Sequence, residues 1–237
     1  MSVVPNKNHA LDCLHCEYRK LRMFCNLSPV ALQHFDSIGS TIQLPRRAVL
    51  FHEGDAANSV FVLCSGKVKL FCTSKEGKVL TLKIAGPGDV LGLSAVLSNT
   101  GYEITAEIME LCQTKVIQRK DFLKFIDLYA EGSMHTVNSL SEEYKSAFQN
   151  ARRLVLSGST SGRLARLLLD WGIASDCGKP QLRFTMSLTH EELASMAGTT
   201  RETISRLLSR FQRENLIEVH GSSMTILNPA HLEGMCS

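Results

Sequence analysis

Three cysteines near the N-terminus have the residue type and spacing of a metal or cluster site. Cys13 and Cys16 form a C-x2-C pair, and Cys25 follows after eight intervening residues. Soft thiolates at such spacings bind an iron–sulfur cluster or zinc. A fourth ligand then comes from elsewhere, with Cys112 as the first candidate and His15 as the second. Metal-free thiol redox chemistry, or an unidentified small ligand as the signal, are the alternatives.

The remaining cysteines are interpreted as packing residues. The N-terminus lacks the apolar core of a secretory signal, so we expect a cytoplasmic protein whose thiols stay reduced. The eight cysteines are therefore not expected to form a disulfide framework. Cys64, Cys72 and Cys177 have the character of ordinary small residues of the core or surface.

A second pattern, in residues 187–226, is typical of a helix-turn-helix. Thr189 is a predicted N-cap, and Glu192 three residues later completes a capping box. Gly198 ends this first helix and allows a tight turn, and the second helix begins at Arg201.

The second helix, residues 201–215, has an apolar face and a basic face. It contains four arginines and two glutamates, an excess of positive charge that suits a phosphate-lined groove. An arginine fork can pair with guanine O6 and N7, and a glutamate can accept from cytosine N4. Double-stranded DNA is thus the predicted partner. The expected contact residues are Thr189, Thr200, Arg201, Glu202, Ser205 and Arg206.

Short strands account for the middle of the chain. In residues 67–72 and 79–84, side chains alternate with a period of two, and glycines recur between the strands. Many short strands with regular turns predict a β-roll or barrel over residues 41–122. A further hairpin, with its turn at His220-Gly221, is predicted after the basic helix as a wing.

A long helix is predicted over residues 133–156, which contain no Gly or Pro. Six of its apolar residues follow a 3,4,3,4,3 spacing, which is that of a two-helix seam. We therefore expect a homodimer, the alternative being a helix that packs only on its own domain. The seam residues are Val137, Leu140, Tyr144, Ala147, Ala151 and Leu154. Residues 157–162 are expected to break the helix as a hinge, and a helix resumes over 163–171.

These elements predict an α+β fold in four segments. Residues 1–28 are the cysteine-bearing segment and residues 29–128 the β-roll sensor domain. Residues 129–158 are the dimerisation helix and hinge, and residues 159–237 a winged helix-turn-helix DNA-binding domain.

Nearly all of residues 13–237 resemble the Crp–Fnr family of bacterial transcription regulators. Residues 198–217, GTTRETISRLLSRFQRENLI, are similar to its recognition helix. FHEGD at 51–55, CSGKVKL at 64–70 and GPGDVLG at 86–92 resemble its sensor-domain turns. The resemblance implies a β-roll of the cyclic-nucleotide-binding type, a dimerisation helix and a winged helix-turn-helix. It also implies a dyad-symmetric operator with TGTGA-like or TTGAT-like half-sites.

The same resemblance assigns roles to residues of the recognition helix. It makes Arg201, Glu202 and Arg206 base readers, and Ser205 matches a base-contacting serine of the Fnr branch. RNA polymerase is a further candidate partner if the protein activates transcription, although no motif identifies the surface that would touch it.

The cysteines are closer to the Fnr branch than to the cyclic-AMP receptor branch. The Fnr branch holds an oxygen-sensitive [4Fe–4S] cluster with three N-terminal cysteines and one sensor-domain cysteine. The resemblance therefore implies Cys13, Cys16, Cys25 and Cys112 as the ligands here. Two features depart from the Fnr pattern. The second gap is longer than in C-x2-C-x5-C, and Cys112 lies three residues before the aligned Fnr ligand. An odd displacement on a strand reverses the side chain's face.

The anchors for cyclic AMP are missing from the sequence. Leu93 stands where the cyclic-AMP branch has a glutamate, and Tyr102 and Glu103 stand where it has an Arg-Ser/Thr pair. No arginine occurs in residues 92–118 to bind a cyclic phosphate. We therefore do not expect cyclic AMP as the ligand.

Composition and motifs bear on the other classes of protein. The formal net charge is only +3, so the placement of charge is more informative than its sum. No run of eighteen apolar residues occurs, so no membrane partner is expected. G-x-S-x-G, P-loop, H-E-x-x-H and Rossmann motifs are absent, so we do not expect an enzyme. The alternative from another class is a β-roll ligand-binding module without DNA function.

Overall fold

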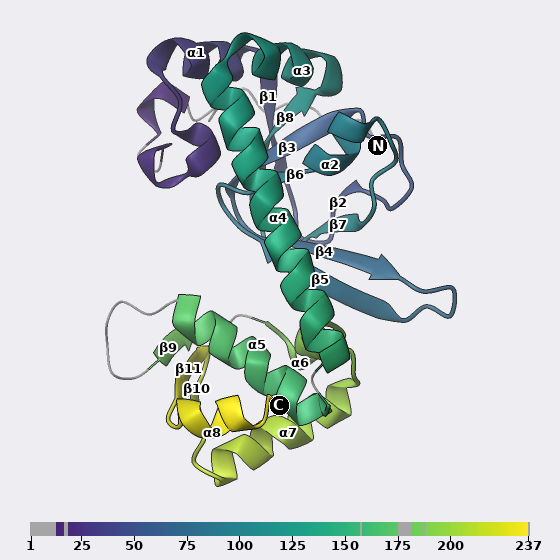
Figure 1. Cartoon of the computed structure of the whole chain (residues 1–237), viewed down its shortest axis with the longest axis vertical. Helices are drawn as coiled ribbons and strands as arrows, with labels where there is room; N and C mark the ends of the chain where they lie inside the picture. The colour runs from purple at the N-terminus through teal and green to yellow at the C-terminus, as the bar shows by residue number, and fades with distance from the viewer. Residues whose placement is uncertain (1–12, 17–18, 157, 175–181, 187, 237) are drawn as a thin grey trace. The chain divides into compact units, whose positions relative to one another are not determined.

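The computed structural model describes residues 13–16, 19–156, 158–174, 182–186 and 188–236 (Figure 1). Within these residues, no helix combines the length and apolar character needed to span a membrane. The chain divides into two compact units. The first runs up to Gly77 and continues over Leu82–Ser146, and the second comprises Lys78–Thr81 and Ala147–Ser237. This division falls inside the long helix, whereas the sequence predicts a segment boundary near residue 158.

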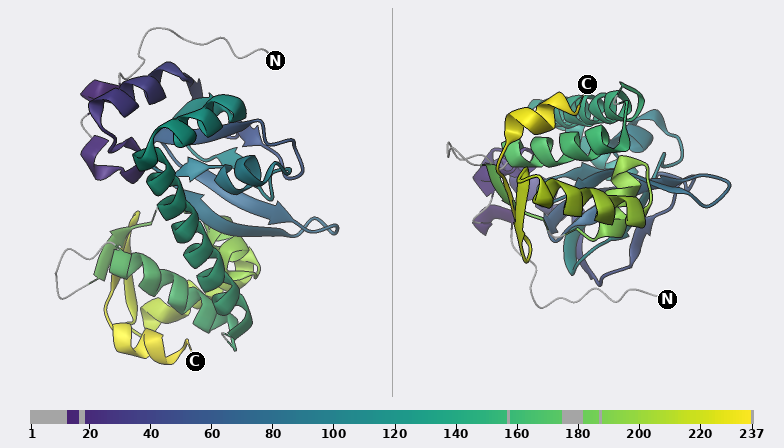
Figure 2. Two further views of the ribbon diagram at one scale, coloured as in Figure 1. Left: turned by 45° about the horizontal axis from the view of Figure 1, so that its top comes forward. Right: turned by 90° about the horizontal axis from the view of Figure 1, so that it is seen from below.

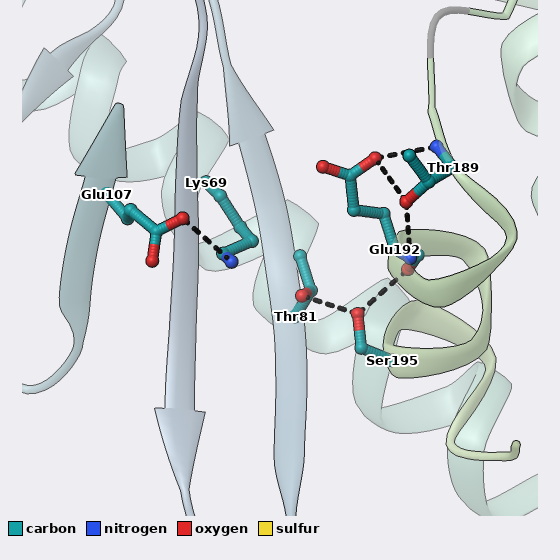
Figure 3. Close-up of polar contacts among 6 residues, drawn as sticks. All are labelled: Lys69, Thr81, Glu107, Thr189, Glu192 and Ser195. Atoms are coloured by element: carbon teal, nitrogen blue, oxygen red, sulfur yellow. Dashed lines mark hydrogen bonds and ion pairs between the residues drawn. The ribbon is translucent and has the colours of Figure 1, made fainter. Parts of the chain in front are cut away.

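Two antiparallel four-stranded sheets form the predicted β-roll, with strand orders β1-β8-β3-β6 and β2-β7-β4-β5 (Figure 1). Cross-strand pairs support the register, since Lys69 on β4 lies opposite Glu107 on β7. Their Nζ and Oε1 atoms are 3.3 Å apart (Figure 3). The strands are β1 (Gly39–Leu44), β2 (Val49–Phe51), β3 (Ser59–Ser65), β4 (Val68–Thr73), β5 (Val79–Ala85), β6 (Val90–Leu91), β7 (Thr105–Ile108) and β8 (Cys112–Gln118).

Short helices precede the roll, and an aromatic cluster anchors them. The side chain of Phe24 is fully buried, with its ring centroid 5.5 Å from that of Phe35 and 6.0 Å from that of Phe122. The described short helices over residues 13–25 thereby lie beside α1 (Pro29–Ser37), as the left-hand view in Figure 2 shows. The helices of this unit are the 3-10 helices η2 (Cys13–His15), η3 (Arg19–Leu21) and η4 (Met23–Cys25), followed by α1 (Pro29–Ser37), α2 (Leu93–Ser98) and α3 (Arg119–Leu128).

The long helix α4 spans Ala130–Leu156 and so begins three residues before its predicted start. Gly132 lies in its first turn. A Cβ at this glycine would lie 2.6 Å from Cε1 of Phe125, so the missing side chain permits close packing of α4 on α3. The glycine is therefore a packing residue and not a helix stop.

The second unit contains the winged helix-turn-helix. Helix α5 starts at Thr160, so part of the predicted break at 157–162 is helical. The predicted hairpin is confirmed, and a third strand, β9, which the sequence reading missed, pairs with it. The elements are α5 (Thr160–Ala174), β9 (Leu182–Thr185), α6 (His190–Ala197), α7 (Arg201–Arg213), β10 (Ile217–His220), β11 (Ser223–Ile226) and α8 (Pro229–Gly234). The fold class predicted from the sequence is thus confirmed.

Candidate DNA-reading helix and thiol site

A capping box fixes the start of α6. The Thr189 hydroxyl accepts from the backbone N–H of Glu192 at 3.2 Å, and Glu192 Oε2 accepts from the backbone N–H of Thr189 at 2.6 Å (Figure 3). These reciprocal bonds satisfy donors that a helix start otherwise leaves unpaired. The predicted N-cap is confirmed, while contact of Thr189 with DNA stays a prediction.

The turn between α6 and α7 is held at three points. Gly198 adopts left-handed φ and ψ of 62° and 43°, a conformation that favours glycine. Arg163 on α5 donates from Nε to the carbonyl oxygen of Ala197 at 2.7 Å, which caps the end of α6. The Thr200 hydroxyl accepts from the backbone N–H of Thr203 at 3.3 Å and so caps α7.

Helix α7 separates its apolar and polar residues by face. On the apolar face, Ile204, Leu208 and Phe211 are buried, whereas Leu207 is only half-buried. The polar face lies in the N-terminal half of the helix, where the helix dipole favours negative groups such as phosphates. Its predicted readers are exposed or half-buried side chains: Arg201, Glu202, Ser205 and Arg206.

Local hydrogen bonds orient these polar side chains. Glu202 accepts from its own backbone N–H and from the Thr200 hydroxyl, which lowers the pKa of its carboxyl and keeps it an ionised acceptor. Ser205 Oγ lies 2.8 Å from Nδ1 of His190, the first residue of α6. His190 was missed by the sequence reading because one residue at a helix start leaves no periodic signal.

Helix α4 has an exposed apolar stripe in a different register from the one predicted. Leu140 packs against the core of the first unit and Leu154 is half-buried, so these two predicted seam residues lie off the exposed face. Tyr144 is 71% exposed and Val155 79%. The exposed stripe follows a 3,4,3,4,3,4 spacing and consists of Met134, Val137, Ser141, Tyr144, Phe148, Ala151 and Val155. Of the predicted residues, Val137, Tyr144 and Ala151 belong to it, and the exposed Ala147 lies beside it.

The three N-terminal cysteines lie in one half-buried region of the first unit. Cys13 on η2 and Cys25 on η4 pack against the core, and Cys16 is half-buried as well. Burial raises the pKa of the Cys13 thiol to about 12 and that of the Cys25 thiol to about 11. As free thiols, Cys13 and Cys25 are therefore protonated at neutral pH, and their nucleophilic thiolate form is scarce.

Cys112 does not join this region. It is fully buried at the start of β8, and burial raises its pKa to about 11. The first candidate for a fourth ligand therefore faces the interior, as its odd displacement from the aligned Fnr position predicts. The second candidate, His15, is exposed on η2. Cys177 lies outside the described residues, and Cys72 on β4 is half-buried.

Among the described residues, no group of three or more His, Cys, Asp or Glu side chains is arranged to hold a single metal ion. A zinc ion binds sulfur at about 2.3 Å in a tetrahedron, so its ligands must lie almost in contact with one another. A four-iron cluster takes one thiolate on each iron, so its ligands lie farther apart than those of one ion.

The residues at the positions of the cyclic-AMP anchors make other contacts within the first unit. Leu93 and Tyr102 belong to the buried core, and the Tyr102 hydroxyl donates to the Ser59 carbonyl oxygen at 2.6 Å. The carboxylate of Glu103 accepts from the Ser94 hydroxyl at 3.0 Å. A carboxylate at this place repels a phosphate.

Two family models match the chain, one in each half. The cyclic nucleotide-binding domain matches residues 41–129, and the Crp-like helix-turn-helix domain matches residues 162–235.

Full-length relatives support the same assignment. The cAMP-activated global transcriptional regulator CRP of Salmonella typhimurium is 24% identical, over 77% of this chain and 87% of its own. A CRP-like cAMP-activated global transcriptional regulator of Mycobacterium tuberculosis is 25% identical, over 89% of this chain and 94% of its own. In fold, a CooA mutant from Carboxydothermus hydrogenoformans aligns over 99% of both chains, with a TM-score of 0.76 at 23% identity. The β-roll, the capped helix α7 and these matches agree: this chain joins a cyclic nucleotide-binding domain to a Crp-like helix-turn-helix domain and is a Crp-like DNA-binding transcription regulator, a class of proteins that are not enzymes.

Proposed function

We propose that this regulator binds DNA as a homodimer at a dyad-symmetric site and that its N-terminal cysteines make the binding responsive to oxygen or redox state. The observation that carries the DNA part is the polar face at the N-terminal half of α7. Arg201 and Arg206 project there with an ionised Glu202, on a helix whose start is capped by Thr200. Arginine reads guanine and a carboxylate reads cytosine in the major groove.

The homodimer is supported by the exposed stripe of α4. Its 3,4 spacing over Met134–Val155 matches the seam of two parallel helices. Phe148 is 55% exposed and Tyr144 71%. Burying such aromatic side chains against a second copy removes a large apolar area from water. A symmetric dimer presents two α7 helices, which is why the operator should be palindromic.

The redox part is supported by the half-buried cysteines and by their spacing. The absence of a tight three-ligand group among the described residues counts against zinc, and protonated thiols count against rapid metal-free thiol chemistry. The donor chemistry fits a [4Fe–4S] cluster, for which Cys13, Cys16 and Cys25 would supply three thiolates. When bound, such a cluster supplies a group that oxygen alters.

A cyclic nucleotide bound in the β-roll is a weaker candidate for the signal than the N-terminal cysteines. The two relatives described above are cAMP-activated, and this chain has the same type of domain. Yet Leu93 and Tyr102 are committed to the core, and Glu103 stands where a phosphate would need a cation. We therefore infer that cyclic AMP is not the ligand. RNA polymerase remains a predicted partner of an activating form.

The DNA part is tested by fluorescence anisotropy on dyad-symmetric duplexes with TGTGA-like or TTGAT-like half-sites. Arg206→Ala should weaken binding of the preferred duplex by about 5- to 100-fold and relax its base preference, because a bidentate base contact is lost. The control is Arg213→Ala, an exposed arginine at the far end of α7. It should weaken all duplexes alike or not at all. Unchanged affinity and base preference in Arg206→Ala would refute this role of α7.

The redox part is tested by iron and sulfide analysis of protein purified and reconstituted without oxygen. We expect about four iron and four sulfide per chain and a visible absorption band that bleaches in air. A colourless protein without iron after reconstitution would overturn this part of the proposal and leave the DNA part standing.

A further inference from the structure

Cys64 lies on the sheet face that Cys112 does not share. On the paired strands β3 and β8, Val62 stands directly opposite Lys115. Side chains alternate between faces along a strand, so Cys64, two residues after Val62, points to the face of Lys115. Cys112 lies three residues from Lys115 and points to the other. The register shifts between Leu63 and Ser65, so that Ser65 stands opposite Gln113, which shares its face with Lys115. Cys64, the residue within this bulge, therefore stays on that face.

A chain of polar contacts leads across this face from Cys64 to Cys13. The backbone N–H of Lys115 lies within hydrogen-bond reach of the Cys64 sulfur. The Lys115 ammonium, on a side chain only 4% exposed, forms an ion pair with Asp36 of α1. The Asp36 carboxylate in turn accepts a hydrogen bond from the Cys13 thiol. Cys13 and Cys64 therefore flank the same buried lysine.

A second route joins Cys25 to the same strand. The backbone N–H of Cys25 donates to the carbonyl oxygen of Arg22 at 3.0 Å. The side chain of Arg22 lies over Gly88, where a Cβ would be 3.0 Å from its Cγ. Gly88 donates its N–H to the carbonyl oxygen of Leu63 at 2.8 Å, next to Cys64. Gly88 has a φ of 98°, so the turn both requires a glycine and leaves room for Arg22.

The electrostatic neighbours of each thiol give the same picture. Cys64 interacts with Cys13, Cys16 and Cys25, whereas Cys112 interacts with Cys64 and Glu110 only. Cys64 is thus the one sensor-domain thiol, among the described residues, that lies near all three N-terminal thiols.

We propose that Cys64 is the fourth ligand and completes the thiolate set of Cys13, Cys16 and Cys25 for an iron–sulfur cluster. The assignment rests on the redox part of the proposed function. It puts Cys64 in the place of Cys112 as the fourth ligand, and it gives Cys64 a role other than packing. Each thiol releases its proton to solvent as its sulfur binds one iron of a cluster assembled from iron and inorganic sulfide, and this ligation transfers no electron.

Two cations suit the charge of the site. Thiolates bound to a cluster make the site anionic, and a nearby positive charge stabilises it. Lys115 and Arg22 interact with Cys64, and Arg22 interacts with Cys25 as well. Position 115 is also where the resemblance to the Fnr branch would put the fourth cysteine. Here a lysine occupies that position, and the thiol stands on the neighbouring strand.

The first test is cluster retention by full-length protein reconstituted without oxygen and then desalted. Iron, sulfide and visible absorbance are measured for the wild type, Cys64→Ser, Cys64→Ala and Cys112→Ala. Cys72→Ser is the matched control, because Cys72 is a half-buried cysteine on another strand of the roll. Both Cys64 variants should retain at least fivefold less cluster than the wild type, and the other two should retain it in full. Thermal melts of the cluster-free forms show that the variants fold.

The second test needs no cluster and no variant. Cluster-free wild-type protein is treated with dibromobimane, a short thiol–thiol cross-linker, and the joined peptides are identified by mass spectrometry. We expect the peptide containing Cys64 to be joined to one containing Cys13, Cys16 or Cys25. Joining of Cys112 to these peptides instead would contradict the assignment.

The outcomes separate the two proposals. If the wild type retains neither iron nor sulfide, the redox function and the ligand assignment fall together. If the wild type binds a cluster and both Cys64 variants bind as much, only the role of Cys64 is overturned. Loss of the cluster in Cys112→Ala, with retention in Cys64→Ser, would return the fourth position to Cys112.

Discussion

Among single residues, Glu143 on α4 is a half-buried acid whose ionised form destabilises the folded state. Burial, opposed by Lys83 and aided by the carboxylates of Glu103 and Asp89, raises the pKa of its carboxyl to about 7. The folded protein therefore holds this proton between about pH 4.5 and pH 7, where the unfolded chain has lost it. The stability that this proton provides is fully present below pH 4.5 and is lost as the pH rises through 7.

We predict that Glu143→Gln stabilises the protein at pH 8, on the order of 1 to 3 kcal/mol, and changes little at pH 4.5. The amide keeps the shape of the protonated acid and carries no charge to desolvate. Urea denaturation at the two pH values measures the difference. An equal effect at both values would show that the carboxyl of Glu143 is not the titrating group.

The N-cap Thr189 and the polar residues of α7 could be predicted from the sequence, because capping and helical spacing are local rules. The proposed role of Cys64 could not be predicted in this way, because which strand lies beside β8, and with what register, depends on pairings between distant residues.

At the scale of elements, the capping box makes α6 a support for the reading helix. Thr189→Ala removes the hydroxyl that accepts from the Glu192 N–H, and should lower the free energy of unfolding by about 1 kcal/mol. Thr189→Ser keeps that oxygen and should stay close to the wild type. Urea denaturation compares the three proteins, and equal stability of all three would show that the cap contributes nothing.

The exposed stripe of α4 gives a prediction for assembly. Phe148→Glu places a charge in the proposed seam, where burying it without a partner is costly, and should weaken the dimer at least a hundredfold. Asn138→Glu adds the same charge off the stripe and should leave the dimer intact. Sedimentation velocity over a concentration series measures both. A dimeric Phe148→Glu protein would place the interface elsewhere.

The presence of a helix or strand could be predicted from local sequence patterns, whereas the residues at which it begins and ends were predicted less accurately. The long helix was expected from its lack of Gly and Pro, but its start was misplaced because Gly132 packs on Phe125 inside the helix. The seam register was misjudged because apolar spacing alone does not say which apolar residues face the core. Leu140 faces the core, while Val137 is exposed.

At the scale of the whole molecule, the cysteines and the reading helix belong to different compact units, and α4 contributes residues to both. For a signal at the cysteines to affect DNA binding, it must stabilise a conformational or assembly state in which α7 binds DNA with a different affinity. The homodimer is the simplest such state. Dimerisation would cover the exposed stripe of α4 and would bring two copies of α7 to the spacing of two half-sites. Cluster binding and DNA binding should then favour each other reciprocally.

The most direct test is anisotropy of a dyad-symmetric duplex under argon, with cluster-loaded and cluster-free samples of the same protein. We predict that the loaded protein binds the duplex at least tenfold more tightly, that exposure to air abolishes the difference, and that added salt lowers the affinity of both forms. Equal affinity of the loaded and cluster-free proteins, before and after air, would contradict it.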